Sequence, residues 1–495
     1  MNAIIFFISL FVEIGQVMII YGFLNSLFST VVSALFLLTV VITIVVVILD
    51  NRNPFKTLAW VLVLVCFPIV GLIAYVFFGR DTRKERLISK KGYERLSKYP
   101  MMEWQQQQAS RTLDEQPQCM HFFRKVNNAL PFEGNDIKVY TDGYSMVQSL
   151  LSTIARAKHH IHMEFYIFEN DAVGRLVRDA LMDKAREGVE VRVLYDDVGC
   201  WKVDHLFYDA MREVGIEVRS FLKVRFPRFT SKVNYRNHRK LVIVDGIAGF
   251  VGGMNLAERY VKGVSWGIWR DAMMKVEGKG VYGLQTAFLT DWYATDHSLL
   301  TSSCYFPEMA DCGRNLVQVV TADPIGKWRD IMQGLLLATA SSRNYFYVQT
   351  PYLLPTEPVL LALKTAALSG VDVRIMVPKR GDSKWIHWGT MSYLEELLEA
   401  GVKIYRYNKG FLHSKLWVSD DCFFSIGSTN MDFRSFEHNF EVNAFVYNSA
   451  SAMEVKQLFL SDQKDAELLL LKEWRMRPWS RKIMESVIRL LSPLL

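Results

Sequence analysis

The pattern of hydrophobic and polar positions divides the chain into an apolar N-terminal part and a longer part in which apolar and polar segments alternate. Residues 29–49 and 57–78 are uncharged apolar runs of 21 and 22 residues. As helices, both are long enough to cross a hydrocarbon core of about 30 Å. Pro68 and Gly71 lie inside the second run, and spanning helices tolerate both residues. The pattern therefore predicts two membrane spans.

The first apolar residues of the chain have no single interpretation. Residues 3–28 are apolar but include Glu13 and Gln16, so a third span, an interfacial helix and a buried partner helix all remain open. No Lys or Arg precedes Arg52, so the basic start of a cleavable secretory signal is missing and we expect the segment to be retained.

The charges that flank the apolar runs indicate an orientation. Eight Lys and Arg residues lie between positions 80 and 98, whereas only Arg52 and Lys56 lie between the two runs. The positive-inside rule then places the large C-terminal part in the cytoplasm. Six scattered cysteines without CxxC or CxxH spacing fit a reducing compartment. We expect a multi-pass protein of the plasma (inner) membrane, and the net charge of +7 suits an anionic partner.

Beyond residue 130 the chain runs through one order of elements twice. The alternation of strands and helices predicts an α/β protein with mixed sheets flanked by helices. The expected elements of the first copy are strand 160–168, helix 172–187, strand 189–194, helix 203–213 and strand 217–221. Those of the second copy are strand 344–349, helix 357–368, strand 371–376, helix 389–399 and strand 402–406.

The repeat extends past these elements, because Phe288 and Asp291 recur as Phe459 and Asp462. We therefore predict two repeated domains that pack face to face, with the active site at their interface, where pockets tend to lie. The expected boundaries are 1–80 for the membrane region, 81–130 for a basic and polar linker, 131–300 and 301–470 for the two domains, and 471–495 for a C-terminal amphipathic helix.

The last segment carries apolar residues at helical spacing. Trp479, Ile483, Val487, Leu490 and Leu491 form one stripe, and charged residues occupy the positions between them. This pattern predicts an amphipathic helix that is either docked on the protein or lies on the bilayer.

Two copies of one polar motif stand out from the repeat. The first is His238-x-Lys240-x4-Asp245, and the second is His413-x-Lys415-x4-Asp420, 175 residues later. Each is followed by a small-residue turn and an asparagine, with Gly253 and Asn255 after the first copy and Ser428 and Asn430 after the second. Two copies in register are hard to attribute to chance.

The motif suits chemistry on a phosphodiester. A His and a Lys two residues apart on an extended segment point to the same face. Imidazole can attack phosphorus or carry a proton near neutral pH, and ammonium and amide groups can bind the non-bridging oxygens. The predicted catalytic residues are His238, Lys240, Asp245, His413, Lys415 and Asp420, of which the two Asp are more typical of turn anchors. The predicted phosphate-binding residues are Asn255, Asn430, Gly253 and Ser428.

Between about residues 130 and 470, this pair of motifs resembles the phospholipase D superfamily. Within it the chain is similar to bacterial cardiolipin synthases, on the paired apolar runs, the segments Tyr235-Arg-Asn-His-Arg-Lys-Leu and Thr350-Pro-Tyr352, and the terminal Leu-Leu-Ser-Pro-Leu-Leu. The resemblance implies two phospholipase D-like domains. It also implies that each motif His is oriented by a strand carboxylate, and we assign Asp271 to His238 and Glu441 to His413 on this basis.

The resemblance further implies that two phosphatidylglycerol molecules are joined into cardiolipin and glycerol through a phosphohistidine, with His238 as nucleophile. The chain lacks a GxxxxGK[ST] loop and a clustered carboxylate motif, so we expect neither a nucleotide cofactor nor a metal. Another donor or acceptor lipid, or a membrane-anchored phosphodiesterase or nuclease, remains open. Aromatic and basic residues interleave over 221–236, which fits lipid or nucleic acid, and the predicted spans favour lipid.

Overall fold

The computed structural model describes residues 26–49, 54–75, 79, 105–110, 117–224 and 235–492. The predictions for residues 3–25, for the basic cluster at 80–98 and for most of 221–236 lie outside the described residues. The chain divides into a small unit, residues 1–81, and a large catalytic unit, residues 82–495.

The small unit contains helix α2 (Ser26–Leu49), followed by α3 (Pro54–Cys66) and α4 (Pro68–Ala74). Within the described part of the chain, the segment Val32–Leu49 of α2 is the one helix that is long and apolar enough to cross a membrane. Its 24 residues extend about 36 Å at 1.5 Å per residue. The small unit therefore indicates membrane anchoring.

The second apolar run differs from the expected single helix. It bends sharply at Phe67, just before Pro68, and continues as α4. Gly71 sits on the inside of the bend, where an added Cβ would lie 2.8 Å from the carbonyl oxygen of Val63. The pyrrolidine ring of Pro68 prevents a regular continuation, so α3 on its own extends only about 20 Å.

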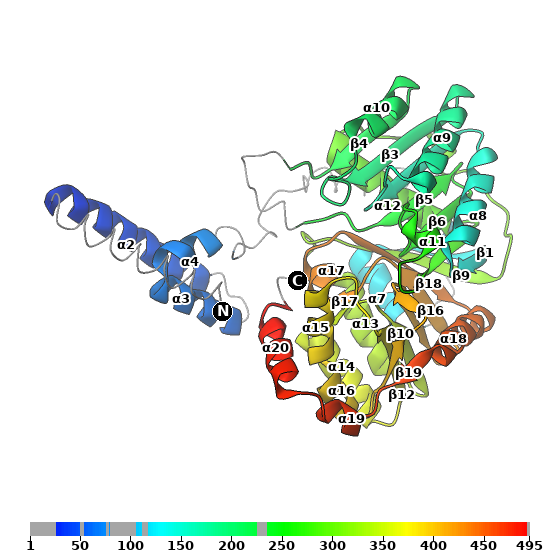
Figure 1. Cartoon of the computed structure of the whole chain (residues 1–495). Coiled ribbons are helices and arrows are strands. Elements are labelled where there is room, and N and C mark those ends of the chain that lie inside the picture. The colour runs from blue at the N-terminus through cyan, green and yellow to red at the C-terminus, as the bar shows by residue number, and fades with distance from the viewer. Residues whose placement is uncertain are drawn as a thin grey trace. The chain divides into compact units, whose positions relative to one another are not determined.

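The catalytic unit contains two halves with the same strand order (Figure 1). The strands of the first half are β1 (Pro131–Tyr140), β2 (His160–Phe165), β3 (Glu190–Asp196), β4 (Glu217–Phe221), β5 (Lys240–Val244), β6 (Ala248–Gly252), β7 (Ile268–Arg270) and β8 (Met273–Glu277). Those of the second half are β9 (Asn315–Ala322), β10 (Tyr345–Gln349), β11 (Leu353–Leu354), β12 (Asp372–Pro378), β13 (Lys403–Tyr407), β14 (Gly410–Leu412), β15 (Leu416–Ser419), β16 (Phe423–Gly427), β17 (Met431–Asp432), β18 (Glu441–Tyr447) and β19 (Ala466–Leu468).

Both halves belong to one mixed sheet. The order β1-β8-β6-β5-β2-β3-β4 of the first half repeats as β9-β18-β16-β15-β10-β12-β13 in the second, and antiparallel pairing of β1 with β9 joins them. Strands β2, β3 and β4 run parallel, as do β10, β12 and β13, because helices connect them. The predicted α/β class with two repeated, mixed-sheet domains is confirmed.

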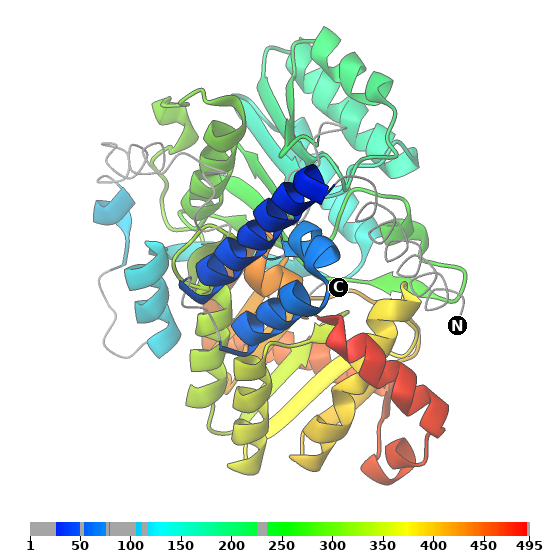
Figure 2. The same cartoon turned by 90° about the vertical axis from the view of Figure 1, so that its left-hand side faces the viewer.

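Helices cover both faces of the sheet (Figures 1 and 2). Those of the first half are α8 (Gly143–Ala155), α9 (Ala172–Arg186), α10 (His205–Glu213), α11 (Arg259–Lys262) and α12 (Val281–Asp296). Those of the second half are α13 (Asp330–Ser341), α14 (Glu357–Leu368), α15 (Lys384–Ser392), α16 (Leu394–Glu399), α17 (Phe433–Glu437) and α18 (Ser449–Lys464), and α19 (Leu471–Arg475) and α20 (Trp479–Leu490) follow.

A core shared by the two halves contains the repeated phenylalanines. It combines residues of β5, β6 and β8 with residues of β15, β16 and β18. From α12, Phe288 stacks on His162 with ring centroids 4.4 Å apart, and from α18, Phe459 stacks on Tyr347 at 4.9 Å. The repeat noted in the sequence therefore corresponds to equivalent packing positions.

Part of the predicted linker is helical and belongs to the core. Helix α7 (Gln118–Asn127) packs against α13 and β9 of the second half. The ring centroid of the fully buried Phe123 lies 4.5 Å from that of Phe445. The Phe123 ring also occupies the space that a Cβ on Gly334 would need, so only glycine fits there. The expectation of a polar linker is wrong for this segment, because hydrophobic positions 119, 120 and 123 form one buried helix face.

Candidate active site

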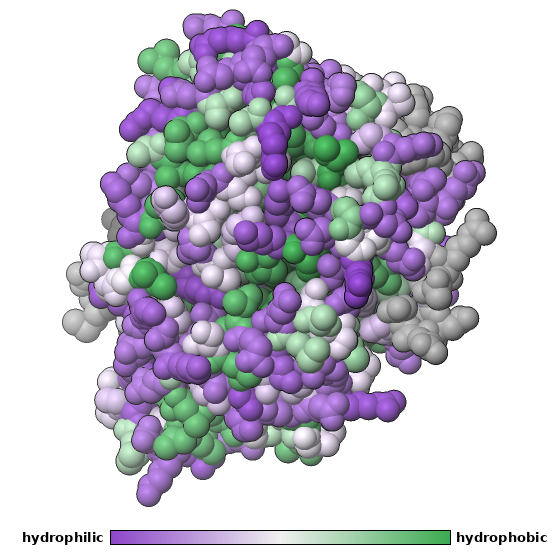
Figure 3. Space-filling view, turned by 90° about the vertical axis from the view of Figure 1, so that its right-hand side faces the viewer, coloured by the Kyte–Doolittle hydropathy of each residue, from purple (hydrophilic) through white to green (hydrophobic). Residues whose placement is uncertain are grey.

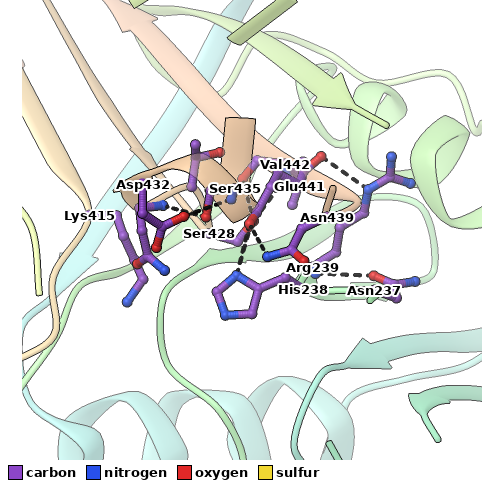
Figure 4. Close-up of polar contacts among 12 residues, drawn as sticks. Asn237, His238, Arg239, Lys415, Ser428, Asp432, Ser435, Asn439, Glu441 and Val442 are labelled. Carbon is purple, nitrogen blue, oxygen red and sulfur yellow. Dashed lines mark hydrogen bonds and ion pairs between the residues drawn. The ribbon is translucent and has the colours of Figure 1, made fainter. Parts of the chain in front are cut away.

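The two motif histidines lie in short extended segments that precede strands β5 and β15. His238 Nδ1 is 3.1 Å from each carboxylate oxygen of Glu441 (Figure 4). His413 Nδ1 is 2.6 Å from Oδ2 of Asp271. Each imidazole therefore presents Nδ1 to a buried carboxylate and keeps Nε2 for chemistry.

The carboxylates are exchanged between the halves, so the expected pairing of Asp271 with His238 and of Glu441 with His413 is wrong. Short parallel backbone pairings cause the exchange. Asn237 pairs with Phe440, and the His238 N–H donates to the Phe440 carbonyl at 2.9 Å.

The second motif repeats this arrangement. Strand β14 pairs in parallel with β7, with Leu412 opposite Arg270, and the His413 N–H donates to the Arg270 carbonyl at 2.6 Å. In both cases the residue before a motif histidine is aligned with the residue before a carboxylate of the other half. The active site is thus built at the interface between the halves, in a way that neither half achieves alone.

The small residue after each motif fits the carboxylate beside it. The Ser428 hydroxyl donates to Glu441, as Figure 4 shows. At the equivalent position, a Cβ on Gly253 would lie 2.2 Å from an oxygen of Asp271. The difference between Gly253 and Ser428 therefore follows from the carboxylate that each one faces. Their predicted phosphate-binding role stays a prediction.

Two buried arginines hold the backbone of these carboxylate residues. Arg239 forms an ion pair with Asp291 and donates to the Glu441 carbonyl at 3.1 Å. Arg270 pairs with Asp462 at 2.6 Å and donates to the Asp271 carbonyl at 2.7 Å. The repeated aspartates of α12 and α18 thus fix the two arginines that hold the backbone of Glu441 and Asp271. Sequence reasoning noted Asp291 and Asp462 but did not connect them with the site.

The motif lysines are buried beside their histidines. Lys240 Nζ donates to the His238 carbonyl and lies 5.2 Å from the ring centroid of Tyr166. Lys415 Nζ donates to the His413 carbonyl and is 2.9 Å from His413 Nδ1. Burial lowers the pKa of Lys240 well below its usual range and that of Lys415 to about 8. An anion that enters the site would stabilise both ammonium groups.

Burial also dominates the charge of the histidines. It lowers the pKa of His238 and of His413 to about 4, although Glu441 and Asp271 pull in the opposite direction. Without an anion in the site, both imidazoles are therefore neutral near pH 7, which leaves an Nε2 lone pair for attack on an electrophile.

The motif aspartates lie at the far end of their strands and bind backbone. Asp245 accepts hydrogen bonds of 2.7–2.9 Å from the N–H groups of residues 158, 159 and 160. Asp420 accepts three bonds of 2.7–2.9 Å from residues 343, 344 and 345. Both have positive φ, 53° and 52°, which Asp tolerates better than most residues. These contacts favour the turn-anchoring interpretation over a catalytic one.

The two predicted phosphate-binding asparagines have different surroundings. Asn255 accepts from the Ile167 N–H at 3.1 Å and donates to the Tyr260 hydroxyl at 2.6 Å, so its amide is engaged. The side-chain oxygen of Asn430 is buried and finds no hydrogen-bond partner among the described residues. An unpaired buried amide is costly unless a ligand or water satisfies it. Phosphate binding by Asn255 and Asn430 stays a prediction.

Aromatic side chains surround the histidines, and sequence reasoning did not assign them to the site. The ring of Tyr166 lies 5.0 Å from that of His238. Around His413, the ring centroids of Trp269, Tyr260 and Tyr352 lie at 5.4, 6.1 and 6.3 Å. Tyr166 and Tyr352 follow the equivalent strands β2 and β10, and their place after these strands is a signal that could have identified them.

Comparison with known proteins agrees with this geometry. The family model described as "Cardiolipin synthase, PLD-like domain" matches residues 150–292 and 336–463, and "Phospholipase_D-nuclease N-terminal" matches residues 37–80. A cardiolipin synthase of Alkalihalophilus pseudofirmus is 38% identical, over 100% of this chain and 99% of its own length. The chain belongs to the cardiolipin synthase family. The phospholipase D-like resemblance is confirmed, and the activity is that of a phosphatidyltransferase that synthesises cardiolipin.

Other relatives give the same result. The major cardiolipin synthase ClsA of Bacillus subtilis is 38% identical, over 95% of this chain and 100% of its own length. A cardiolipin synthase of a Geobacillus species is 40% identical over 92% of each chain. The crystal structure of a phosphatidylserine synthase from Haemophilus influenzae covers 76% of this chain and 100% of its own, with a TM-score of 0.59 and 13% identity. That likeness shows the fold alone.

We predict that Asp245→Ala lowers the free energy of unfolding by about 1–3 kcal/mol, because it leaves buried N–H groups without an acceptor. Asp245→Asn keeps one acceptor oxygen and a residue that tolerates positive φ, so it should destabilise less. The folded fraction of either variant should retain turnover within about tenfold, in contrast to His238→Ala. Denaturant unfolding and turnover per folded molecule test this. Loss of turnover in Asp245→Asn at unchanged stability would make Asp245 catalytic.

Proposed function

We propose that the enzyme transfers the phosphatidyl group of one phosphatidylglycerol to a glycerol hydroxyl of a second one and releases free glycerol. The observation that supports this most directly is the pair of buried histidines, one from each half, with carboxylates on both Nδ1 atoms. Such a pair can alternate between covalent and acid–base roles, as the exchange of one phosphodiester for another requires.

In the first step, Nε2 of His238 attacks phosphorus. An N–P bond forms, the P–O bond to glycerol breaks, and His413 gives a proton to the departing oxygen. His413 must be protonated to do this, although burial lowers its pKa to about 4 in the absence of substrate. The negative charge of a bound phosphodiester favours the imidazolium and raises that pKa, so substrate binding itself supplies the acid.

In the second step, His413 removes the proton from a glycerol hydroxyl of the acceptor phosphatidylglycerol. That oxygen attacks phosphorus, the N–P bond breaks, and His238 is regenerated. The protons and bonds of the two steps balance, so the mechanism needs no nucleotide. His238 is assigned as nucleophile because enzymes that resemble this one usually attack with the histidine of the first motif.

We assign binding of the non-bridging phosphate oxygens to Lys240, Lys415 and Asn430. All three are buried, with exposed fractions of 5% or less, and both lysines contact the histidine of their own motif. Two ammonium groups offset the charge of a phosphodiester and of its more negative transition state. The Asn430 side chain is buried, and the N–H groups of its amide are donors that a phosphate oxygen can accept.

Incubation of the purified enzyme with phosphatidylglycerol as the only lipid tests the proposed function. We expect cardiolipin and glycerol in equal amounts, with no added nucleotide. His238→Ala and His413→Ala should each lower this reaction by several orders of magnitude, at unchanged thermal stability. Phosphatidic acid as the main product would show that water is the acceptor, and a requirement for another lipid would reassign the donor or the acceptor.

The exchanged pairing of carboxylates makes a separate prediction. Because Asp271 holds His413, Asp271→Asn should impair the same step as His413→Ala, and Glu441→Gln should share the defect of His238→Ala. On phosphatidylglycerol, Asp271→Asn should lose about 10²–10⁴-fold in rate, the usual contribution of general acid catalysis. On phosphatidyl-p-nitrophenol, whose leaving group needs no proton, its burst of nitrophenol should stay within about tenfold of the unmodified enzyme.

Burst kinetics of the four variants on both substrates measure these effects, with the paired amide substitutions as each other's control. If Asp271→Asn shared the defect of His238→Ala, the pairing would lie within each half, contrary to the hydrogen bonds described above. Label trapped on His413 rather than His238 would exchange the two roles but leave the pairing test valid.

We further propose that the enzyme is a multi-pass protein of the plasma membrane with a cytoplasmic catalytic unit. The supporting observation is the excess of Lys and Arg at 80–98 over Arg52 and Lys56. We predict that a reporter active only in the cytoplasm is inactive when fused after Leu49 and active when fused after Asp81 or Leu495. Reporter activity after both Leu49 and Asp81 would mean that α2 crosses the membrane and that α3 and α4 do not cross it.

A further inference from the structure

Helix α20 turns its hydrophobic stripe away from the catalytic unit. The side chains of Trp479, Ile483, Val487 and Leu490 are 74%, 51%, 50% and 80% exposed. The helix packs on α15 with its other side, through Ile488, which is 1% exposed (Figures 1 and 2). An amphipathic helix of a globular protein normally buries its apolar stripe, so this orientation indicates a partner outside the catalytic unit.

Ion pairs hold α20 in this orientation. The buried carboxylate of Glu485 accepts 2.9 Å hydrogen bonds from both Arg477 and Arg481, and Arg477 also contacts Glu395 at 2.7 Å. A charge buried on the docked side is costly to release unpaired. The exposure of the stripe therefore follows from specific packing rather than from a loose chain end.

Helix α15, on which α20 packs, follows a segment that contacts the surroundings of His413. Helix α15 begins two residues after Asp382, whose carboxylate accepts a 2.7 Å hydrogen bond from the Tyr352 hydroxyl. The Tyr352 ring lies 6.3 Å from that of His413. On the first turn of α15, Trp385 is 56% exposed. Trp385 is thus exposed on the helix against which α20 packs, three residues after Asp382.

The first half also has a tryptophan after the corresponding strand. Strand β3 corresponds to β12 in the repeat, and the loop after β3 carries Trp201, which is 77% exposed. The neighbouring Cys200 Sγ lies 3.5 Å from the Tyr166 carbonyl oxygen, and the Tyr166 ring lies 5.0 Å from that of His238. Each half therefore has an exposed tryptophan in the segment that also contacts the tyrosine beside its motif histidine.

Cations accompany these aromatic residues. Lys379, Arg380 and Lys384 are exposed in the segment that leads into Trp385. Tryptophan and basic side chains together suit the headgroup region of an anionic bilayer, where the ring enters the interface and the cation meets phosphate. By contrast, Figure 3 shows a different face of the molecule, on which hydrophobic areas are scattered between hydrophilic side chains.

We propose that Trp201, Trp385 and the exposed stripe of α20 form a membrane-seating surface that enters the interface of an anionic phospholipid bilayer. The inference rests on the proposed function, because only a lipid substrate requires both histidines to reach headgroups. Seated in this way, the site takes donor and acceptor from the bilayer without first extracting them into water. The exposed cations favour a phospholipid surface over a second copy of this basic chain.

An activity comparison tests the surface in the full-length enzyme reconstituted in vesicles. We expect the triple variant Trp479→Ser, Ile483→Ser, Val487→Ser to lose about tenfold or more in rate on long-chain phosphatidylglycerol of the bilayer, because it removes interfacial apolar area. It should act normally on dihexanoyl phosphatidylglycerol supplied as monomers. The matched control replaces exposed leucines on other helices, Leu176, Leu361 and Leu368, with Ser, and should leave both rates unchanged. The proposal would be overturned if the first triple variant, relative to the unmodified enzyme, kept the same fraction of its rate on both substrates.

A second measurement tests whether α20 lies in the bilayer and does not depend on enzyme activity. A fluorophore on Val487→Cys, in a background whose exposed native cysteines are serine, should be quenched by nitroxide-labelled lipid and protected from aqueous iodide. The same label on Leu368→Cys should show the reverse. Protection from both quenchers would mean that protein covers α20 and would overturn the proposal. If the enzyme made no cardiolipin from any phosphatidylglycerol, the proposed function would fail while this measurement still reported on the membrane surface.

Discussion

The structure depends on one constraint, the pairing of backbone across the two halves at each catalytic histidine. The N–H of His238 binds the carbonyl before Glu441, and that of His413 binds the carbonyl before Asp271. A shift of register by one residue would turn the carboxylate to the opposite side, and the imidazole would lose its partner. The fold and the catalytic geometry are therefore coupled, because the contacts that join the halves also orient the histidines.

The interface is unusually rich in buried charge. Arg239 and Asp291 are almost completely removed from water, Arg270 is buried against a partly buried Asp462, and both motif lysines are buried as well. Buried ion pairs add little net stability but are costly to break, so they specify one arrangement of the halves. The same desolvation lowers the pKa of both histidines and both lysines. A bound anionic phosphodiester raises these pKa values again, because its charge stabilises the protonated histidines and lysines. Substrate binding is thereby coupled to the protonation state of the site.

The chemistry and the location of the substrate make complementary demands. A phosphodiester within a bilayer must reach two histidines that are largely removed from water, while its acyl chains remain in an apolar environment. Helix α2 is long and apolar enough to anchor the chain in a membrane. In the catalytic unit, each half has an exposed tryptophan after a corresponding strand, and α20 has its apolar side chains exposed while its opposite side packs on α15. Exposure of an apolar stripe to water is unfavourable, but the ion pairs on the docked side of α20 hold the helix in this orientation.

The sequence by itself determined the two motifs, the repeat and much of the secondary structure, because these follow from residue identity and local periodicity. Strand β4 and helix α14 have the predicted bounds, 217–221 and 357–368. Tertiary structure alone decided which carboxylate serves which histidine, because the partners are 203 and 142 residues apart and both strands carry an acid. It also decided the place of α7 in the core and the outward face of α20. Local pattern shows that a helix has an apolar side, but only the packing of distant elements determines what that side meets.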